Sequence, residues 1–261
     1  MLVMATFLFD EIIFGPVKSR RLGASLGINL LPANGKFCNF NCIYCECGWS
    51  SGTEMKIRLP SREEIRNCLE IRLFQILDQK TPLDRITFAG NGEPTLHPDF
   101  PGIIDDTVRI RDRLVPGVKI AVLSNGSQLD NPEIFDALGK IDMNILKLDS
   151  ANEQTVKLIN QPPPGYRVAR VIDGMIRYKS RFILQTLFLK GNFGGITVDN
   201  TTEEEVKNWL EVVKKVSPEM VMIYTIARDT PIQTLQKTSP EMLDTIAEEV
   251  RKLGIPAQVS Y

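Results

Sequence analysis

The chain has 261 residues, 43% of them hydrophobic, with 31 Lys and Arg against 32 Asp and Glu. This composition describes a soluble globular protein with enough apolar residues for a large core. The balanced charge excludes any inference of a partner from net charge alone. The length is within the range that one α/β barrel or sheet fills, so we expect one domain over residues 1–261.

The opening segment MLVMATFLF is apolar for only nine residues, lacks a basic leader and runs into Asp10 and Glu11. It is typical of neither a signal peptide nor a membrane span, so we expect a cytoplasmic protein without membrane association. Four of the five cysteines lie between positions 38 and 47. They are too few and too clustered to staple a chain of this size, and thiolates gathered in this way indicate a metal site.

Six short apolar or β-branched runs, each bounded by turn residues, are typical of buried parallel strands. They cover residues 26–32, 85–90, 119–126, 144–150, 182–189 and 220–226. Segments with helical spacing separate them, and three carry start signals: Ser61 with Glu64, Thr202 with Glu205, and Ser239 before Pro240. This alternation predicts an α/β fold, either an open doubly wound sheet or a barrel.

Two connections between the predicted elements are expected to differ in length and mobility. The Pro-rich segment 161–165 is too short to be more than a tight connection, whereas the glycine-rich segment 190–200 is expected to form a mobile loop over the functional face.

Polar residues collect directly after the predicted strands, including the cysteine run, the segment 90–94, the segment 124–126, Asp149 with Ser150, and Arg228. Both candidate folds place their chemistry at the carboxyl ends of strands, so this pattern favours an enzyme.

Cys38, Cys42 and Cys45 have the spacing C-x3-C-x2-C, with Tyr44 just before the last cysteine. Soft thiolates prefer zinc or iron-sulfur centres, and three ligands leave one position open. The motif resembles that of the radical S-adenosylmethionine (SAM) superfamily. The resemblance implies a partial (β/α)6 TIM barrel and a 4Fe-4S cluster whose fourth iron chelates SAM. A structural zinc site that uses Cys47 as the fourth thiolate is the alternative.

Further segments extend the resemblance. FAGNGEPTLHPDF is similar to the superfamily's GGEP element, with Asn91 where glycine is usual, then Gly92, Glu93 and Pro94. By resemblance, this strand end binds the amino group of SAM through backbone carbonyls. Ser124 and Asn125 stand where the family places contacts to the ribose, and the backbone near Tyr44 stands where relatives contact the adenine.

The fourth predicted strand ends in Lys147 and Asp149, a level from which relatives contact the SAM carboxylate or the substrate. Alternation places both residues on one face, which we expect to point inward. Gln185 and Thr186 are unusual in a buried strand, and an interior amide needs partners that a ligand would supply. His97, the only histidine of the chain, is interpreted as loop punctuation rather than a substrate contact.

The resemblance implies that the reduced cluster passes one electron to SAM, which splits into methionine and a 5′-deoxyadenosyl radical that removes a hydrogen atom from the substrate. A one-electron donor such as flavodoxin or ferredoxin is the implied partner. Three cysteines are committed, so one cluster without an auxiliary-cluster extension is expected. Cys47 is expected to be a free thiol near the site and Cys68 to pack in the core.

The substrate is left open. GPVKSRRLGASLGINLLP and IYTIARDTP resemble a subgroup related to the wyosine synthases of transfer RNA, which makes RNA a candidate. Arg20, Arg21 and the basic stretch 167–181 support that candidate, while the neutral charge of the chain opposes it. The alternatives are an activase of a glycyl radical enzyme or another modifier of proteins, and a non-catalytic metal-binding or electron-transfer module.

Overall fold

The computed structural model of the chain describes residues 7–19, 21–50 and 58–261. Its main sheet has eight strands in the order β1-β2-β3-β4-β5-β6-β9-β11. They are β1 (Ile13–Ser19), β2 (Gly23–Ile28), β3 (Arg85–Phe88), β4 (Lys119–Ser124), β5 (Met143–Lys147), β6 (Ile183–Leu187), β9 (Met220–Tyr224) and β11 (Ala257–Ser260). In this sheet β1 pairs antiparallel with β2, and every other pair of neighbouring strands is parallel.

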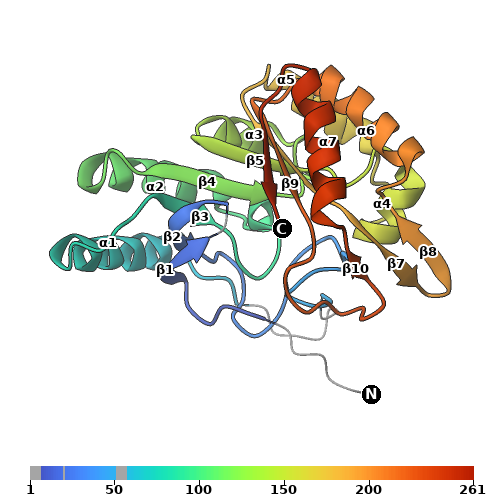
Figure 1. Ribbon diagram of the computed structural model, residues 1–261. Helices are drawn as coiled ribbons and strands as arrows, with labels where there is room; N and C mark the ends of the chain where they lie inside the picture. The colour runs from blue at the N-terminus through green and yellow to red at the C-terminus, as the bar shows by residue number, and fades with distance from the viewer. Residues whose placement is uncertain (1–6, 20, 51–57) are drawn as a thin grey trace.

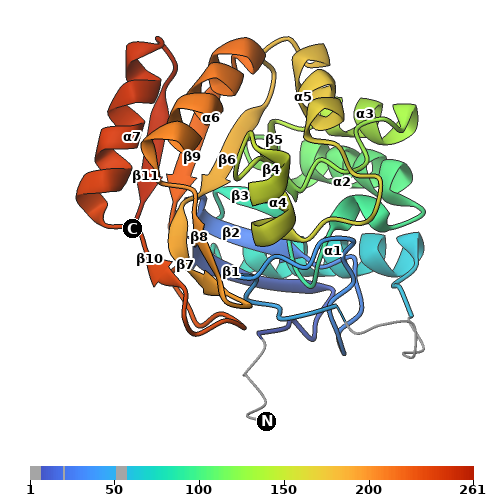
Figure 2. The same ribbon diagram turned by 90° about the vertical axis from the view of Figure 1, so that its right-hand side faces the viewer.

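Helices follow the strands and cover the outer face of the curled sheet, as Figures 1 and 2 show. They are α1 (Arg62–Asp78), α2 (Phe100–Leu114), α3 (Pro132–Gly139), α4 (Glu153–Asn160), α5 (Val168–Arg177), α6 (Glu203–Val216) and α7 (Pro240–Lys252). The predicted α/β fold is therefore confirmed as a parallel half-barrel. Within the described ranges, no helix is long and apolar enough to cross a membrane.

The predicted helix starts are confirmed. The Ser61 hydroxyl accepts from the Glu64 amide while the Glu64 carboxylate accepts from the Ser61 amide, which is a complete capping box at α1. Ser239 caps α7 ahead of Pro240 at the first helical position. These local signals fix where each helix begins, and therefore how long the preceding loop at the functional face is.

The segment 190–200 is not the mobile loop that its glycines suggest. It forms most of a hairpin of β7 (Leu189–Phe193) and β8 (Ile196–Asp199), and β10 (Gln236–Lys237) adds a third strand. Gly194 and Gly195 have φ of 59° and 83°, which suits the tight turn of a two-residue hairpin. The prediction was wrong because these glycines serve one turn and not general flexibility.

The N-terminal end of the half-barrel is closed by the turn between β1 and β2. Leu22 is buried against the inward side chains of the sheet, among them Ala121, Ile183 and Met222. Arg85 donates to the Leu22 carbonyl (2.8 Å). The closed end leaves the opposite end, where the parallel strands terminate, as the place for a site.

Candidate metal and cofactor site

The cysteine motif lies in the loop after β2, across the carboxyl ends of the strands. On one side, the Phe37 amide donates to the Asn91 carbonyl (2.8 Å) and the Glu93 amide donates to the Phe37 carbonyl (3.1 Å). On the other side, the Ile43 amide donates to the Ile159 carbonyl (2.9 Å) at the end of α4. The loop is therefore held between two segments that lie far from it in the sequence.

Gly92 is required for this close approach. A Cβ atom at this position would lie 1.9 Å from the carbonyl oxygen of Phe37, and the residue has φ of 145°. No side chain fits between the two segments, so the glycine of the GGEP-like element serves the contact with the cysteine loop. The backbone on both sides of Gly92 thereby lies next to the first cysteine.

The three motif cysteines are free thiols that pack in one cluster, with Cys42 buried and Cys38 and Cys45 half-buried. The Cys38 sulfur accepts from the Phe40 amide (3.4 Å), and the Cys42 sulfur accepts from Asn160 Nδ2 (3.4 Å). Burial raises the pKa of Cys38 to about 12 and also raises the pKa of Cys42. A hydrogen bond from Cys47 lowers the pKa of Cys45 to about 6. Of the three motif cysteines, Cys45 is therefore the one whose surroundings favour the thiolate form.

The donor set of the site is three thiols along one loop. In a 4Fe-4S cluster each cysteine binds a different iron, so three thiols distributed along one loop suit that group. Lys36 is buried beside them and donates to the Gly48 carbonyl (3.1 Å). Its charge helps to lower the pKa of Cys45 and opposes the rise in the pKa of Cys38.

Cys47 lies next to Cys45, where its thiol contacts the Gly90 carbonyl oxygen at 3.4 Å. The hydrogen bond to Cys45 raises the pKa of Cys47 well above its ordinary value. Cys47 therefore lies near the site, and its remaining a free thiol beside a bound cluster stays a prediction. Cys68 is half-buried on α1 and packs against the main core, as predicted.

Glu93 connects the ends of β3 and β4. Its buried carboxylate accepts from the Ser124 hydroxyl (2.9 Å) and the Asn125 amide (2.7 Å), as well as from the amide and hydroxyl of Thr95. Burial raises the pKa of the Glu93 carboxyl, and the hydrogen bonds from Asn125 and Thr95 oppose that rise. Glu93, Ser124 and Asn125, which are three of the residues that the resemblance assigns to SAM, thus form one connected unit.

That unit also touches the cysteine loop. Asn125 Nδ2 donates to Asn39 Oδ1 (2.9 Å) and lies 3.9 Å from the Cys38 sulfur. By contrast, the Asn91 side chain bonds the backbone of Phe9 and Pro32. Pro94 begins a short 3-10 helix capped by Glu93. A role of Asn91 or Pro94 toward SAM stays a prediction that would involve the backbone.

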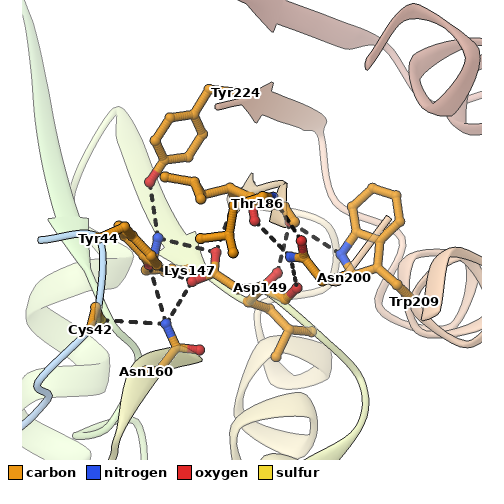
Figure 3. A network of polar contacts seen from close by, with 12 residues as sticks. Cys42, Tyr44, Lys147, Asp149, Asn160, Thr186, Asn200, Trp209 and Tyr224 are labelled. Carbon is orange, nitrogen blue, oxygen red and sulfur yellow. Dashed lines mark hydrogen bonds and ion pairs between the residues drawn. The ribbon is translucent and has the colours of Figure 1, made fainter. Parts of the chain in front are cut away.

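Lys147 and Asp149 point inward and form the centre of a second polar network (Figure 3). Their charged atoms are 3.1 Å apart, and the Asp149 side chain has no exposed surface. Asp149 also accepts from the Tyr44 hydroxyl and, at 2.6 Å, from Asn160 Nδ2. Burial opposes the charge of Lys147, yet Asp149 and Tyr224 raise its pKa above the ordinary value. Lys147 therefore stays protonated beside the cysteines.

Two members of this network could not be found from the sequence. Asn160 contacts Cys42, Tyr44 and Asp149, and Tyr224 accepts from Lys147 Nζ at 2.9 Å. Asn160 ends α4 outside the motif segments, whereas Tyr224 ends β9 within IYTIARDTP, which was quoted for the subgroup resemblance and not for the site. Only the position of Tyr224 at a strand end gave any signal.

The structure also places three further polar residues that the sequence singled out, Thr186, His97 and Gln185. Thr186 faces the helices, where it donates to the Leu148 carbonyl (2.7 Å) and accepts from Trp209 Nε1 (3.1 Å), so it needs no ligand. His97 bonds the Pro60 carbonyl and the Asp99 amide, which is the loop role expected for it. Gln185 is buried on the inward face of β6, beside Lys147 in the register, and its contact with a ligand stays a prediction.

A cavity of about 230 Å³ opens beside the cysteine loop, and we call it the mouth cavity. Its lining combines the motif segment with the residues after β9 and the turn before β2. The lining residues are Arg21, Tyr44, Cys45, Glu46, Cys47, Leu187, Tyr224, Thr225, Ile226, Ala227, Arg228 and Thr230. Cys45 of the motif thus adjoins a space in which a small group fits.

The family follows from this arrangement and from a sequence match. Residues 35–213, which include the cysteine loop and the strand ends around it, match the Radical SAM superfamily. The chain belongs to the radical SAM superfamily of enzymes.

The chain is similar to several known proteins. The chain is 30% identical over 236 residues to a UPF0026 protein of Helicobacter pylori, covering 89% of this chain and 71% of that protein. It is 32% identical to a Brachyspira hyodysenteriae protein named GTPase Obg, of which it spans only 32%. A radical SAM methyltransferase from Sphaerobacter thermophilus has the same fold, with a TM-score of 0.67 at 17% identity over 91% of this chain and 66% of that one.

Proposed function

We propose that this chain binds a 4Fe-4S cluster through Cys38, Cys42 and Cys45 and reductively cleaves SAM, so that a hydrogen atom is removed from a substrate. The observation that supports this proposal is the position of the three thiols. They lie in one loop at the carboxyl ends of a parallel half-barrel, held between the Glu93 segment and the end of α4. The chain belongs to a superfamily whose name describes this chemistry.

When bound, the reduced cluster supplies the electron that splits SAM, and the resulting fragment takes a hydrogen atom from the substrate. The residues of the chain have to hold both molecules and to exclude water. Glu93, Ser124 and Asn125 would hold SAM on the Cys38 side, because they form one buried unit with Asn39 in the cysteine loop.

On the other side of the loop, the Lys147 and Asp149 pair fixes Tyr44. Burial, together with the charge of Asp149, raises the pKa of the Tyr44 phenol, so its hydroxyl keeps its proton and donates to Asp149. The backbone at Tyr44 would then present a rigid edge to the adenine. Asn160 holds Cys42 to the same network, which links the metal ligands to the cofactor contacts.

The cluster needs an external electron, so a one-electron donor such as flavodoxin or ferredoxin is proposed as partner. The cytoplasm is proposed as the location, because clustered reactive thiols stay reduced there. RNA as substrate receives limited support from the basic residues. Arg20 lies outside the described residues, Arg21 lines the mouth cavity, and Arg177 lies over the Phe135 ring at 3.9 Å.

Product analysis after anaerobic reconstitution tests the proposal. The wild type, loaded with iron and sulfide and then reduced, is expected to convert SAM to 5′-deoxyadenosine and methionine. Cys42→Ala is expected to lose both the iron and the cleavage, because each thiolate binds a separate iron. The matched control is Cys68→Ala, since Cys68 lies on α1 outside the site and should keep both.

An unchanged rate of SAM cleavage in Cys42→Ala would contradict the assignment of the ligands. A wild type that binds zinc in place of iron and cleaves no SAM would favour the structural zinc alternative. Iron content and the electronic absorption of the cluster are measured on the same samples, so a missing cluster is distinguished from a missing reaction.

A further inference from the structure

Arg21 has an unusual position for an arginine. It precedes Leu22 in the turn that closes the N-terminal end of the half-barrel, yet its side chain lines the mouth cavity. The guanidinium carbon lies 4.4 Å from the centre of the Tyr224 ring. Nη1 of Arg21 is buried and has no hydrogen-bond partner among the described residues. A buried donor without a partner costs free energy, so an acceptor is expected there.

The other cations around Tyr224 already have partners. Lys147 pairs with Asp149 at 3.1 Å, and Arg228 pairs with Glu46 at 2.6 Å. Arg21 makes no ion pair with any carboxylate in the described part of the chain, and Glu46 is the acidic residue of the cavity lining. The mouth cavity therefore contains one positive charge that the protein itself does not balance.

The backbone of Arg21 is fixed from both sides of the open barrel. Its amide donates to the Ser19 hydroxyl (3.3 Å), and its carbonyl accepts from Gln258 Nε2 on β11 (3.5 Å). Tyr224 is in turn held by the hydrogen bond from Lys147 (2.9 Å). The guanidinium is thus placed in advance against a fixed ring, which lowers the cost of ordering it when a ligand binds.

We propose that Arg21 binds an oxyanion of the substrate, either a carboxylate or a phosphate group. A guanidinium presents parallel N–H donors that match the two oxygens of such a group. The inference rests on the proposed function, because it takes the mouth cavity beside Cys45 as the place where the substrate lies. It names the class of substrate as anionic.

The cavity also limits the size of the bound part. About 230 Å³ holds a compact molecule or one end of a larger molecule. Leu187 and Ile226 give the wall an apolar portion, and Tyr44 and Tyr224 add aromatic rings. The recognised group is therefore an oxyanion attached to a compact, partly apolar body that faces Cys45.

Calorimetric titration of the reconstituted protein with SAM bound tests the proposal. Inorganic phosphate and acetate serve as separate probes of the two oxyanions. The wild type is expected to bind at least one of them, and Arg21→Gln is expected to bind it about ten- to a hundredfold more weakly. Arg21→Lys keeps the charge and is expected to recover part of the affinity. Arg66→Gln, an exposed arginine of α1, is the matched control and should bind as the wild type does.

Preferential binding of phosphate would assign a phosphorylated substrate, and preferential binding of acetate a carboxylate. Equal affinities of the wild type and Arg21→Gln for both probes, or no binding by the wild type, would overturn the inference. A large loss of SAM affinity in Arg21→Gln would also overturn it, because Arg21 would then belong to the cofactor site. Cleavage of SAM is measured in the same samples, and its absence in the wild type counts against the proposed function instead.

Discussion

The Asp149 side chain satisfies several buried donors of the site. Its carboxylate accepts from Tyr44, Asn160 and the Leu187 amide, and it balances the charge of Lys147. Asp149→Asn would leave the lysine without a counter-charge in a buried position. We expect a loss of about 3 kcal/mol in the free energy of unfolding, at the low end of the range for a broken buried pair. Urea denaturation of the cluster-free protein measures it.

A double-mutant cycle separates the charge from the other hydrogen bonds. Lys147→Met in the Asp149→Asn background removes the unpaired cation and is expected to recover about half of the lost stability. If the double variant is no more stable than Asp149→Asn alone, the loss comes from the hydrogen bonds to Tyr44 and Asn160. The ion pair would then contribute little.

Asn125 is the residue by which the SAM placement can be tested most directly. Asn125→Ala removes a side chain that lies between Asn39 and Cys38, while Glu93 still accepts from the backbone amide. We expect SAM to bind with a loss of about 1 to 3 kcal/mol, with the cluster intact. Calorimetry on the reconstituted protein measures this loss.

Asn131→Ala provides the matched control for that measurement. Asn131 caps α3, a few residues beyond the strand end, and its loss should lower stability by about 1 kcal/mol. Its affinity for SAM should not change. Similar losses of SAM affinity in both variants would show that Asn125 acts through the stability of the segment.

The site residues that could be predicted from the sequence are those that lie within a motif or follow a strand pattern. The cysteines have a characteristic spacing, and alternation along the strand placed Lys147 and Asp149 together on the inward face. Asn160 and Lys36 could not be predicted, because their roles depend on which distant segments meet at the cysteine loop. The partner of Thr186 could not be predicted for a related reason: Trp209 comes from α6, which follows the hairpin of β7 and β8.

Among the elements, the hairpin of β7 and β8 depends most on its turn. A Cβ atom at Gly194 would meet no other atom within 4 Å, so only the backbone angle limits a substitution there. Gly194→Val should lower the free energy of unfolding by about 1 to 3 kcal/mol, because a β-branched residue is strained at positive φ. Gly194→Asn should change it by only a few tenths of that amount, since asparagine suits this turn. Urea denaturation compares the two variants.

Equal stability of the two variants would mean that the turn is not the two-residue hairpin described above.

Elements of regular βα alternation were predicted well from their apolar runs and helix caps. Two edge strands were missed: β1 contains Gly15 and Pro16, which indicate a turn, and β11 is short and half polar. The first predicted strand, which is β2, begins at Gly23 and not at residue 26, because the small residues at its start gave no apolar signal.

For the molecule as a whole, the cysteine count limits the number of clusters. Cys47 lies beside Cys45, and Cys68 is separate on α1, so they cannot form a second set of ligands together. Iron analysis with Mössbauer spectra should therefore give about four irons per chain in the wild type. It should give none in a variant with Cys38, Cys42 and Cys45 all replaced by Ala. Iron-sulfur signals that survive in the triple variant would contradict both the single cluster and the role of Cys47.

The turn that buries Leu22 determines how a substrate can enter. Since the half-barrel is closed at that end, a molecule that reaches the mouth cavity has to enter at the cysteine-loop end or through the open side between the edge strands β1 and β11. A chain of RNA or protein cannot thread through the barrel. It would have to present a single unit, such as one nucleotide turned out of its stack or one extended side chain, while the rest stays outside.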